Sequence, residues 1–419
     1  MKIWTIVVGE PSPVDGSDTR LLRTGLLTRC LRARGHDVTW FNGTFDHATK
    51  TERFNQTTIQ TDADGTTLIF LHGRPYAGHV SLPRIANHID GARAFAEIAP
   101  KLPAPDVIAC SYPTIELAAA VAEYARARDI PFILDLRDLW PDMIAEVAPK
   151  PLRWLARLLM APWYKSARKS MRAASGLVGF AGPYLDWGLK KTGRAHGPND
   201  RVFHLAADPQ PVDAESLNAS AAYWDARGIA ADTVNLAFAG MISPRHDFTT
   251  LIDAFRRLPP EKRARLRMVF CGRGEVEDAL KFRAADMPEI LFAGWRNRAE
   301  IAALLARAAA GLLPYRNTPD FLMSFPNKIG EYTGAGLPVI TPLGGEVGRL
   351  IETENCGIVY REGDVESCAQ ILAALADGTV DLAALRAGAR AAYSRHFDAE
   401  KIYAAYAGFL ESQGTKTAA

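Results

Sequence analysis

The chain has 419 residues, of which 48% are hydrophobic and 23% charged, a composition typical of soluble globular proteins with two or three domains. A net charge of +2 provides no general attraction to nucleic acid. The five scattered cysteines form no Cys-x-x-Cys pair and support neither a disulfide framework nor a zinc site. No apolar run approaches the roughly 20 residues of a membrane span, so we expect a cytoplasmic protein that at most attaches to a membrane surface.

Short apolar segments alternate with longer helical patterns along the whole chain. The segments predicted as strands are 3–8, 37–41, 67–71, 107–109, 132–136, 177–180, 236–239, 267–271, 290–292, 311–313, 339–341 and 357–360. Predicted helices include 21–34, 248–258 and 399–412. Because continuous apolar strands that alternate with helices are typical of βαβ units, the sequence predicts an α/β protein with two doubly wound, Rossmann-like parallel sheets.

Two prolines near residue 210 separate the two series of strands. We therefore predict an N-terminal domain over 1–210, a C-terminal domain over 211–395, and a C-terminal helix over 396–419 that crosses back to the first domain. Two such domains are expected to face a cleft. Ligands of open parallel sheets bind at the carboxyl ends of the strands, so the residues that follow each strand are the candidate site residues.

Residues 325–350 hold the densest group of candidate binding residues. Lys328 and Glu331 lie three positions apart at the start of a predicted helix, which puts both side chains on one face. A second helix is predicted to begin after Gly344-Gly345. Helix N-termini present unpaired N–H groups to anions, so a cation, a carboxylate and two such termini suit a ligand with phosphate and hydroxyl groups.

The same stretch, 325–350, resembles the nucleotide-sugar loop of the retaining GT-B glycosyltransferases of family 4. A subgroup of this family carries Pro-x-Lys-x-x-Glu-Tyr, which residues 326–332 match. The resemblance implies that Glu331 binds the ribose hydroxyls of a nucleotide and that Lys328 binds a phosphate. It also places Asn327 in the nucleotide-sugar site.

Other loops lie where this family contacts its donor. The resemblance implies donor-site roles for Gly240, Gly272, Gly274, Trp295, Arg296, Gly16 and Ser17, the last two near the transferred sugar. Trp295 could instead belong to the hydrophobic core, and the loop 9–20 could be a plain connection from strand to helix.

Three charged residues of the family pattern are replaced in this chain. Met323 stands where the family has a glutamate that contacts the donor sugar, and Met241 and His246 stand where it has two cations that bind the diphosphate. We expect Arg245 to take over the phosphate contact, since a guanidinium pairs well with phosphate oxygens. A solvated loop arginine is the alternative.

Residues 135–142 read Asp-Leu-Arg-Asp-Leu-Trp-Pro-Asp and follow the apolar segment 132–134. They resemble the Arg-Asp-Leu-Trp-Pro signature of a bacterial subgroup that builds surface polysaccharides, the N-acetylfucosamine transferase-like members. The resemblance implies that Arg137 and Asp138 face the acceptor. An ion pair of Arg137 that holds the loop, with Trp140 in the core, is the alternative.

Residues 151–172 contain six basic residues, no acidic residue, and interleaved aromatic and apolar residues. This composition suits the surface of an anionic bilayer, and Pro162 is expected to break the helix. A surface helix pair whose apolar side joins the core is the alternative. Asp62-Ala63-Asp64 precedes the strand 67–71 and is expected to form a turn, so we predict no metal site.

Together, the resemblance implies metal-independent, retaining transfer of a hexosyl or N-acetylhexosaminyl group from a nucleotide diphosphate sugar to a glycan. The nucleotide sugar is a substrate, and no cofactor is implied. Catalytic roles are expected for Arg245, Lys328 and Asp138. The implied setting is bacterial exopolysaccharide, capsule or O-antigen assembly, with undecaprenyl diphosphate as a candidate acceptor carrier. A sugar-nucleotide 2-epimerase and a non-catalytic partner of another transferase are alternatives.

Overall fold

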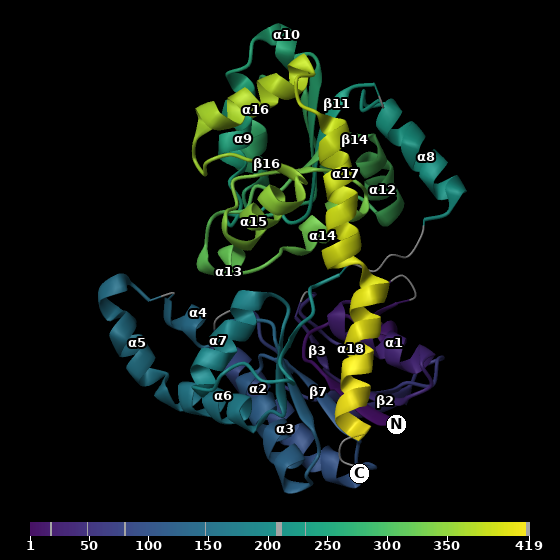
Figure 1. Cartoon of the computed structure of the whole chain (residues 1–419), viewed down its shortest axis with the longest axis vertical. Coiled ribbons are helices and arrows are strands. Elements are labelled where there is room, and N and C mark those ends of the chain that lie inside the picture. The colour runs from purple at the N-terminus through teal and green to yellow at the C-terminus, as the bar shows by residue number, and fades with distance from the viewer. Residues whose placement is uncertain are drawn as a thin grey trace. The chain divides into compact units, whose positions relative to one another are not determined.

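The computed structural model describes the chain except residues 17–18, 48, 79–80, 147, 207–211, 231 and 416–419. The chain forms two compact units (Figure 1). Unit 1 consists of Met1–Asp208 together with Ala399–Ala419, and unit 2 consists of Pro209–Asp398. Each unit has its own sheet and its own hydrophobic core.

Unit 1 is built on a sheet of eight strands in the order β10-β9-β8-β7-β1-β2-β6-β5. Their bounds are β1 Lys2–Ile6, β2 Asp37–Gly43, β5 Thr58–Thr61, β6 Thr67–Leu71, β7 Val107–Tyr112, β8 Phe132–Leu136, β9 Gly176–Gly179 and β10 Arg201–Val202. All neighbouring pairs are parallel except β5 with β6. The edge strand β5 was not predicted because its Thr-Ile-Gln-Thr sequence is largely exposed and lacks an apolar run.

Helices cover this sheet, and a short antiparallel pair, β3 Phe45–Asp46 with β4 Thr51–Glu52, lies apart from it. The helices are α1 Arg23–Ala33, α2 Leu82–Ile98, α3 Ile115–Ala127, α4 Asp142–Glu146, α5 Arg153–Leu159, α6 Ala161–Ala173, α7 Gly182–Thr192 and α18 Ala399–Gly414. The 3-10 turns are Pro13–Asp15, Ala99–Lys101 and Lys150–Leu152. The predicted break in the basic stretch is confirmed, because α5 ends before Met160 and Pro162 lies in the first turn of α6.

The C-terminal helix α18 belongs to unit 1, although about 190 residues of unit 2 precede it. The Tyr406 ring stacks on Phe203, with ring centroids 4.5 Å apart. Glu411 accepts hydrogen bonds from Arg34 Nε and Arg34 Nη2, each at 2.7 Å, and its carboxylate lies 2.6 Å from His36 Nε2. The helix is thus attached by an apolar stack and by an ion pair, which together offset the entropy of ordering it.

Unit 2 has a six-stranded parallel sheet in the order β13-β12-β11-β14-β15-β16. The strands are β11 Val234–Ala239, β12 Leu266–Cys271, β13 Ile290–Gly294, β14 Ala308–Leu312, β15 Val339–Thr341 and β16 Gly357–Val359. The order starts in the middle and moves outward on both sides of β11, as in doubly wound sheets. The strands are apolar because helices bury the sheet.

The helices of unit 2 alternate with these strands along the chain. They are α8 Ala214–Asp225, α9 Phe248–Arg256, α10 Pro260–Arg263, α11 Glu277–Arg283, α12 Arg298–Arg307, α13 Pro319–Leu322, α14 Asn327–Gly334, α15 Gly345–Glu354, α16 Val365–Asp377 and α17 Leu382–Ala392, with a π turn at Tyr393–Phe397. Within the described ranges, no single helix is long and apolar enough to cross a membrane. Two helical segments, Val365–Asp377 and Leu382–Gly414, reach that length and apolar composition only when they are taken together, and the chain bends by 111° between them.

The ion pair at Glu411 predicts a pH dependence of unit 1. Hydrogen bonds from Arg34 and His36 lower the pKa of Glu411 from 4.5 to about 2. Because the folded-state pKa lies below the unfolded value, the pair stabilises the fold above pH 4.5 and loses this effect as the pH falls toward 2. The carboxylate is partly solvated, so we expect about 1 kcal/mol or less.

Chemical unfolding of the wild type and of Glu411→Gln between pH 7 and pH 2 measures this effect. The difference in unfolding free energy between the two should shrink across that interval, since only the wild type loses the ion pair. A difference that stays constant with pH would contradict the assignment.

Candidate functional site

The loops that follow β11, β12 and β13 approach one another at the carboxyl edge of the unit 2 sheet. The Gly240 N–H donates to Cys271 O at 2.8 Å, and the Gly272 N–H donates to Gly294 O at 2.7 Å. A Cβ atom on Gly272 would lie 1.8 Å from Gly240 O, and one on Gly274 would lie 2.1 Å from Ile242 O. These positions require glycine because another backbone occupies the space of the side chain.

Lys328 and Glu331 form an ion pair on the first turns of α14. Lys328 Nζ lies 2.8 Å from Glu331 Oε2, and each side chain is 17% exposed. Lys328 Cε is 3.1 Å from the point where Gly240 would carry a Cβ atom. The structure therefore brings together three predicted residues from two elements, Gly240 from the loop after β11 and the charged pair from α14.

Arg245 is positioned by neighbours on α13. Its Nη2 pairs with the Asp320 carboxylate, and its guanidinium carbon lies 4.2 Å from the centre of the Phe321 ring. The side chain is nevertheless 54% exposed. A guanidinium that is oriented by one carboxylate and one ring, yet still open to solvent, retains donors for an anionic ligand.

His246 does not supply a positive charge to this site. The ring is buried, and its Nδ1 lies 3.1 Å from Ser243 Oγ. Burial and the nearby charges of Arg245, Lys328 and Arg316 lower the pKa of His246 to about 4, although a hydrogen bond involving Ser243 opposes them. The imidazole is therefore neutral at pH 7 and adds no positive charge beside Lys328 and Arg245.

The N-terminus of α15 lies beside a polar cluster that was not predicted. The Gly344 N–H donates to Asn317 Oδ1 at 2.8 Å, and the Asn317 amide donates to Glu362 Oε2 at 3.0 Å. Gly345 has a φ of +59°, and a Cβ there would lie 2.0 Å from Leu322 O. Nothing in the sequence near Asn317 or Glu362 signals this contact, which joins positions 45 residues apart.

Trp295 and Arg296 extend the site from β13. The Trp295 side chain is 69% exposed, so the alternative of a core position is wrong. Arg296 pairs with Glu300 at 3.1 Å, and its guanidinium carbon lies 5.0 Å from the centre of the Tyr223 ring on α8. Tyr223 was not predicted, because it precedes the first strand of the unit and matches no motif.

In unit 1, Arg137 is part of a buried ionic network. Its Nη2 lies 2.9 Å from Asp135 Oδ2, its Nη1 pairs with Glu10, and it also donates to Thr24 Oγ1. The alternative role for Arg137, an ion pair that holds the loop, therefore matches the geometry. Glu10 was not predicted as its partner, since the two lie 127 positions apart.

Asp138 and Gly16 lie in loops that follow β8 and β1. Asp138 Oδ1 accepts a hydrogen bond of 2.7 Å from the Leu139 N–H. Gly16 has a φ of +133°, a conformation that favours glycine. Ser17 lies outside the described residues. Because β8 ends at Leu136, Asp138 lies at the carboxyl edge of the unit 1 sheet.

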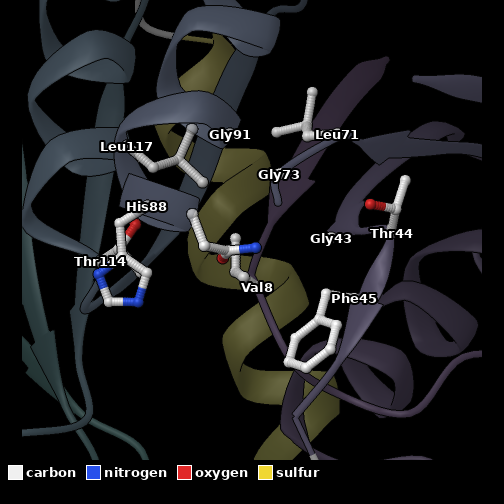
Figure 2. A pocket seen from close by; sticks show the side chains of 11 residues that line it. Val8, Gly43, Thr44, Phe45, Leu71, Gly73, His88, Gly91, Thr114 and Leu117 are labelled. Carbon is white, nitrogen blue, oxygen red and sulfur yellow. The ribbon is translucent and has the colours of Figure 1, made fainter. Parts of the chain in front are cut away.

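A small cavity lies at the same edge of unit 1 and is lined by Val8, Gly43, Thr44, Phe45, His88 and Thr114, among others. Figure 2 shows the His88 ring beside Thr114. Thr114 Oγ1 is buried without a hydrogen-bond partner, although Thr114 occupies the N-cap position of α3. The cavity leaves about 10 Å³ for the centre of a water-sized sphere, which is room for about one water molecule.

The Asp-x-Asp sequence forms the predicted turn between β5 and β6. The Asp62 N–H donates to Thr66 O, and Asp64 Oδ1 accepts from the Thr66 N–H at 2.8 Å. Among the residues that the structure describes, no group of three or more His, Cys, Asp or Glu side chains is arranged to hold a metal ion.

Two family models match the chain, one in each unit. Residues 22–178 match "Glycosyl transferase 4-like domain", and residues 233–377 match "Glycosyl transferases group 1". The amylovoran biosynthesis glycosyltransferase AmsK of Erwinia amylovora is 31% identical over 144 residues. That alignment covers 33% of this chain and 35% of AmsK, so the two are matched over about a third of their lengths.

Solved structures match nearly the whole chain. HepE of Anabaena in complex with UDP has a TM-score of 0.66 and 17% identity, and the match covers 98% of this chain and 99% of HepE. Sucrose-phosphate synthase of Thermosynechococcus elongatus has a TM-score of 0.69 and 16% identity, with 99% of both chains covered. At these identities the matches show the fold alone, two Rossmann-like domains of the GT-B type.

Gly272→Ala tests the close approach of the two loops. The new Cβ would meet a carbonyl oxygen, and the backbone would keep an unfavourable φ of +138°. We expect unit 2 to lose about 3 kcal/mol of unfolding free energy, measured by chemical denaturation. Gly348→Ala is the matched control, because it lies inside α15 and its Cβ meets only Leu343 O at 3.6 Å.

The control substitution should leave stability unchanged or raise it by up to about 1 kcal/mol, since alanine favours helix. Equal stability of the two variants would show that the loops do not approach as closely as the structure indicates.

Proposed function

We propose that the chain transfers a sugar from a nucleotide diphosphate sugar to a glycan. The support is a match to a glycosyl transferase 4-like domain, followed by a match to a glycosyl transferases group 1 domain, on a GT-B fold. The observation that carries this proposal is the Lys328–Glu331 pair over Gly240. HepE, a solved structure with a similar fold, was obtained with UDP and with UDP-glucose, which supports a donor of this class.

Glu331 and Lys328 divide the recognition of the nucleotide between them. A carboxylate accepts two hydrogen bonds at once, which suits the two hydroxyl groups of a ribose. An ammonium group is a compact positive charge that suits a phosphate. The ion pair holds both side chains in place before the ligand binds, so less conformational entropy is lost on binding.

Lys328 and Arg245 also have a role in the chemical step. Negative charge develops on the diphosphate as the bond to the sugar breaks, and fixed cations stabilise that charge. Neutral His246 adds no charge of its own at pH 7. The proposed reaction retains the anomeric configuration, with the departing diphosphate as the base that accepts the proton of the acceptor hydroxyl. It transfers a hexosyl or N-acetylhexosaminyl group and needs no metal ion.

The proposed acceptor is a lipid-linked glycan of bacterial exopolysaccharide, capsule or O-antigen assembly. Two similarities support this setting. AmsK, which matches part of the chain, is named for amylovoran biosynthesis, and WaaG, which has a similar fold, is described as involved in lipopolysaccharide biosynthesis. We place the N-acetylfucosamine transferase-like signature at 137–141 on the acceptor side, with Asp138 beside the acceptor and Gly16 and Ser17 near the transferred sugar.

The proposal also places the protein in the cytoplasm, attached to the inner face of the plasma membrane through residues 151–172. Support comes from α5, where Trp154, Leu158 and Leu159 are exposed instead of joining the core. Exposed apolar side chains among basic residues are typical of a helix that lies on an anionic bilayer.

A thermal-shift screen of UDP-, GDP-, ADP- and dTDP-sugars tests the donor site. A ligand that binds the folded state alone stabilises it, by about 2.7 kcal/mol at 100 times Kd. Glu331→Ala should abolish the shift because it removes the ribose contact. Glu352→Ala, an exposed glutamate on the neighbouring helix α15, is the control and should keep the full shift. An unchanged shift in Glu331→Ala would contradict the ribose assignment.

Turnover in EDTA tests the absence of a metal requirement. With the donor identified by the screen and a membrane extract as acceptor source, the rate in EDTA should equal the rate in added Mg²⁺. Loss of turnover in EDTA that Mg²⁺ restores would refute metal independence. Formation of an epimeric sugar nucleotide without acceptor would contradict sugar transfer as the reaction.

A further inference from the structure

Two adjoining hollows on unit 1 form one groove between α4, α6 and α7. Their volumes are about 460 and 900 Å³, and both are lined by Asp142, Arg168 and Lys191. We call this surface the basic groove, after its cationic lining residues Arg157, Lys165, Arg168, Arg172, Lys190 and Lys191. None of these residues has a role in the donor site, which lies in unit 2.

The acidic residues of the groove do not neutralise this charge. Asp142 accepts hydrogen bonds from Tyr164 and Trp187, both at 2.8 Å, and pairs with Lys191 at 2.5 Å. It therefore anchors α6 and α7 to α4 and uses one of the six cations. Glu146 is the second acid in the lining. Two carboxylates against six cations leave a net positive surface, and Lys165, Arg168 and Lys190 are exposed on it.

An apolar surface continues from the groove along α5. Leu155, Leu158 and Leu159 follow the spacing of one helix face, and Trp154 and Leu152 extend that face. Trp154, Leu158 and Leu159 are 66%, 63% and 72% exposed. Arg157, on the same helix, lines the groove. Cationic and uncovered apolar side chains thus border one another on a single surface.

We propose that the basic groove binds the phosphate headgroup of an anionic phospholipid while the apolar face of α5 enters the bilayer interface. This inference rests on the proposed membrane placement and adds the specific contact. Arginine and lysine together suit phosphate oxygens. A free phosphate compound fits the charge of the groove but leaves the apolar face of α5 unexplained, whereas a bilayer accounts for both.

Flotation with vesicles tests the proposal on the full chain. Vesicles of phosphatidylcholine alone are compared with vesicles that also contain phosphatidylglycerol. Wild type should float with the anionic vesicles and stay behind with the neutral ones. The groove variant Lys165→Gln/Arg168→Gln should bind the anionic vesicles about tenfold or more weakly, since each cation near the surface contributes to binding.

The control variant Lys101→Gln/Arg126→Gln removes the same charge from residues of unit 1 that do not line the groove. Lys101 precedes β7, Arg126 lies in the last turn of α3, and both are exposed. This variant should float like the wild type. Leu158→Ser/Leu159→Ser should also bind weakly, because it removes the apolar contact. All variants should keep the donor thermal shift, which shows that unit 2 is intact.

The outcomes separate the two proposals. If wild type floats with neither kind of vesicle, the membrane placement and the headgroup site are both wrong. If wild type floats but the groove and control variants bind equally, the headgroup site is wrong and the membrane placement stands. A last assay adds soluble pyrophosphate to the vesicle-bound wild type, with a phosphate concentration equal to that of the lipid. If pyrophosphate releases the protein from anionic vesicles, the groove is a site for free anions and the headgroup assignment is wrong.

Discussion

The absence of a side chain at Gly272, which lets the loops after β11 and β12 meet, is the constraint on which the candidate donor site depends. A Cβ atom on Gly272 would lie 1.8 Å from Gly240 O. A Cβ atom on Gly240 would lie 3.1 Å from Lys328 Cε. A side chain at Gly272 would separate the two loops, whereas a side chain at Gly240 would shift the flexible end of Lys328 by a few tenths of an ångström. The meeting of the loops therefore places Gly240 beside Lys328, whose ammonium group is held by Glu331.

Unit 1 has a buried ionic network beside its sheet. Unit 1 places a full ion pair inside the protein, since Arg23 Nε lies 2.8 Å from Asp135 Oδ2 with both side chains 2% exposed. Arg23 also donates to the carbonyl oxygens of Phe203 and His204. Breaking such a pair leaves an uncompensated buried charge, so the network ties the end of the sheet to the segment that α18 covers. In unit 2 the loops after β11 and β12 meet at Gly272, and ion pairs position Lys328 and Arg245.

Much of the fold could be predicted from the sequence, because buried parallel strands are continuous apolar runs. The strands 67–71, 132–136 and 339–341 agree with β6, β8 and β15 at both ends. Edge strand β5 could not be found this way, since its residues are largely exposed and form no apolar run. The predicted ends of other strands differ from the observed ends by a few residues. At β11, for example, polar Asn235 occupies a buried strand position because its side chain is hydrogen-bonded.

The candidate site was predictable where its residues are close in sequence. Lys328 and Glu331 lie one helical turn apart, so their contact follows from spacing alone. Partners distant in sequence could not be found, as shown by Asp320 for Arg245, Tyr223 for Arg296 and Glu10 for Arg137. The protonation state of His246 could not be predicted either, because the fall in its pKa results from burial and from the charges of Lys328 and Arg316, which are distant in sequence, as well as from that of Arg245.

A crystal structure of the protein with an intact nucleotide diphosphate sugar tests the central claim most directly. The account predicts that the diphosphate contacts Lys328 and Arg245 beside Gly240, that the ribose hydroxyls donate to Glu331, and that no metal ion bridges the phosphates. A donor bound at another place, or a divalent ion between the phosphates and the protein, would contradict it.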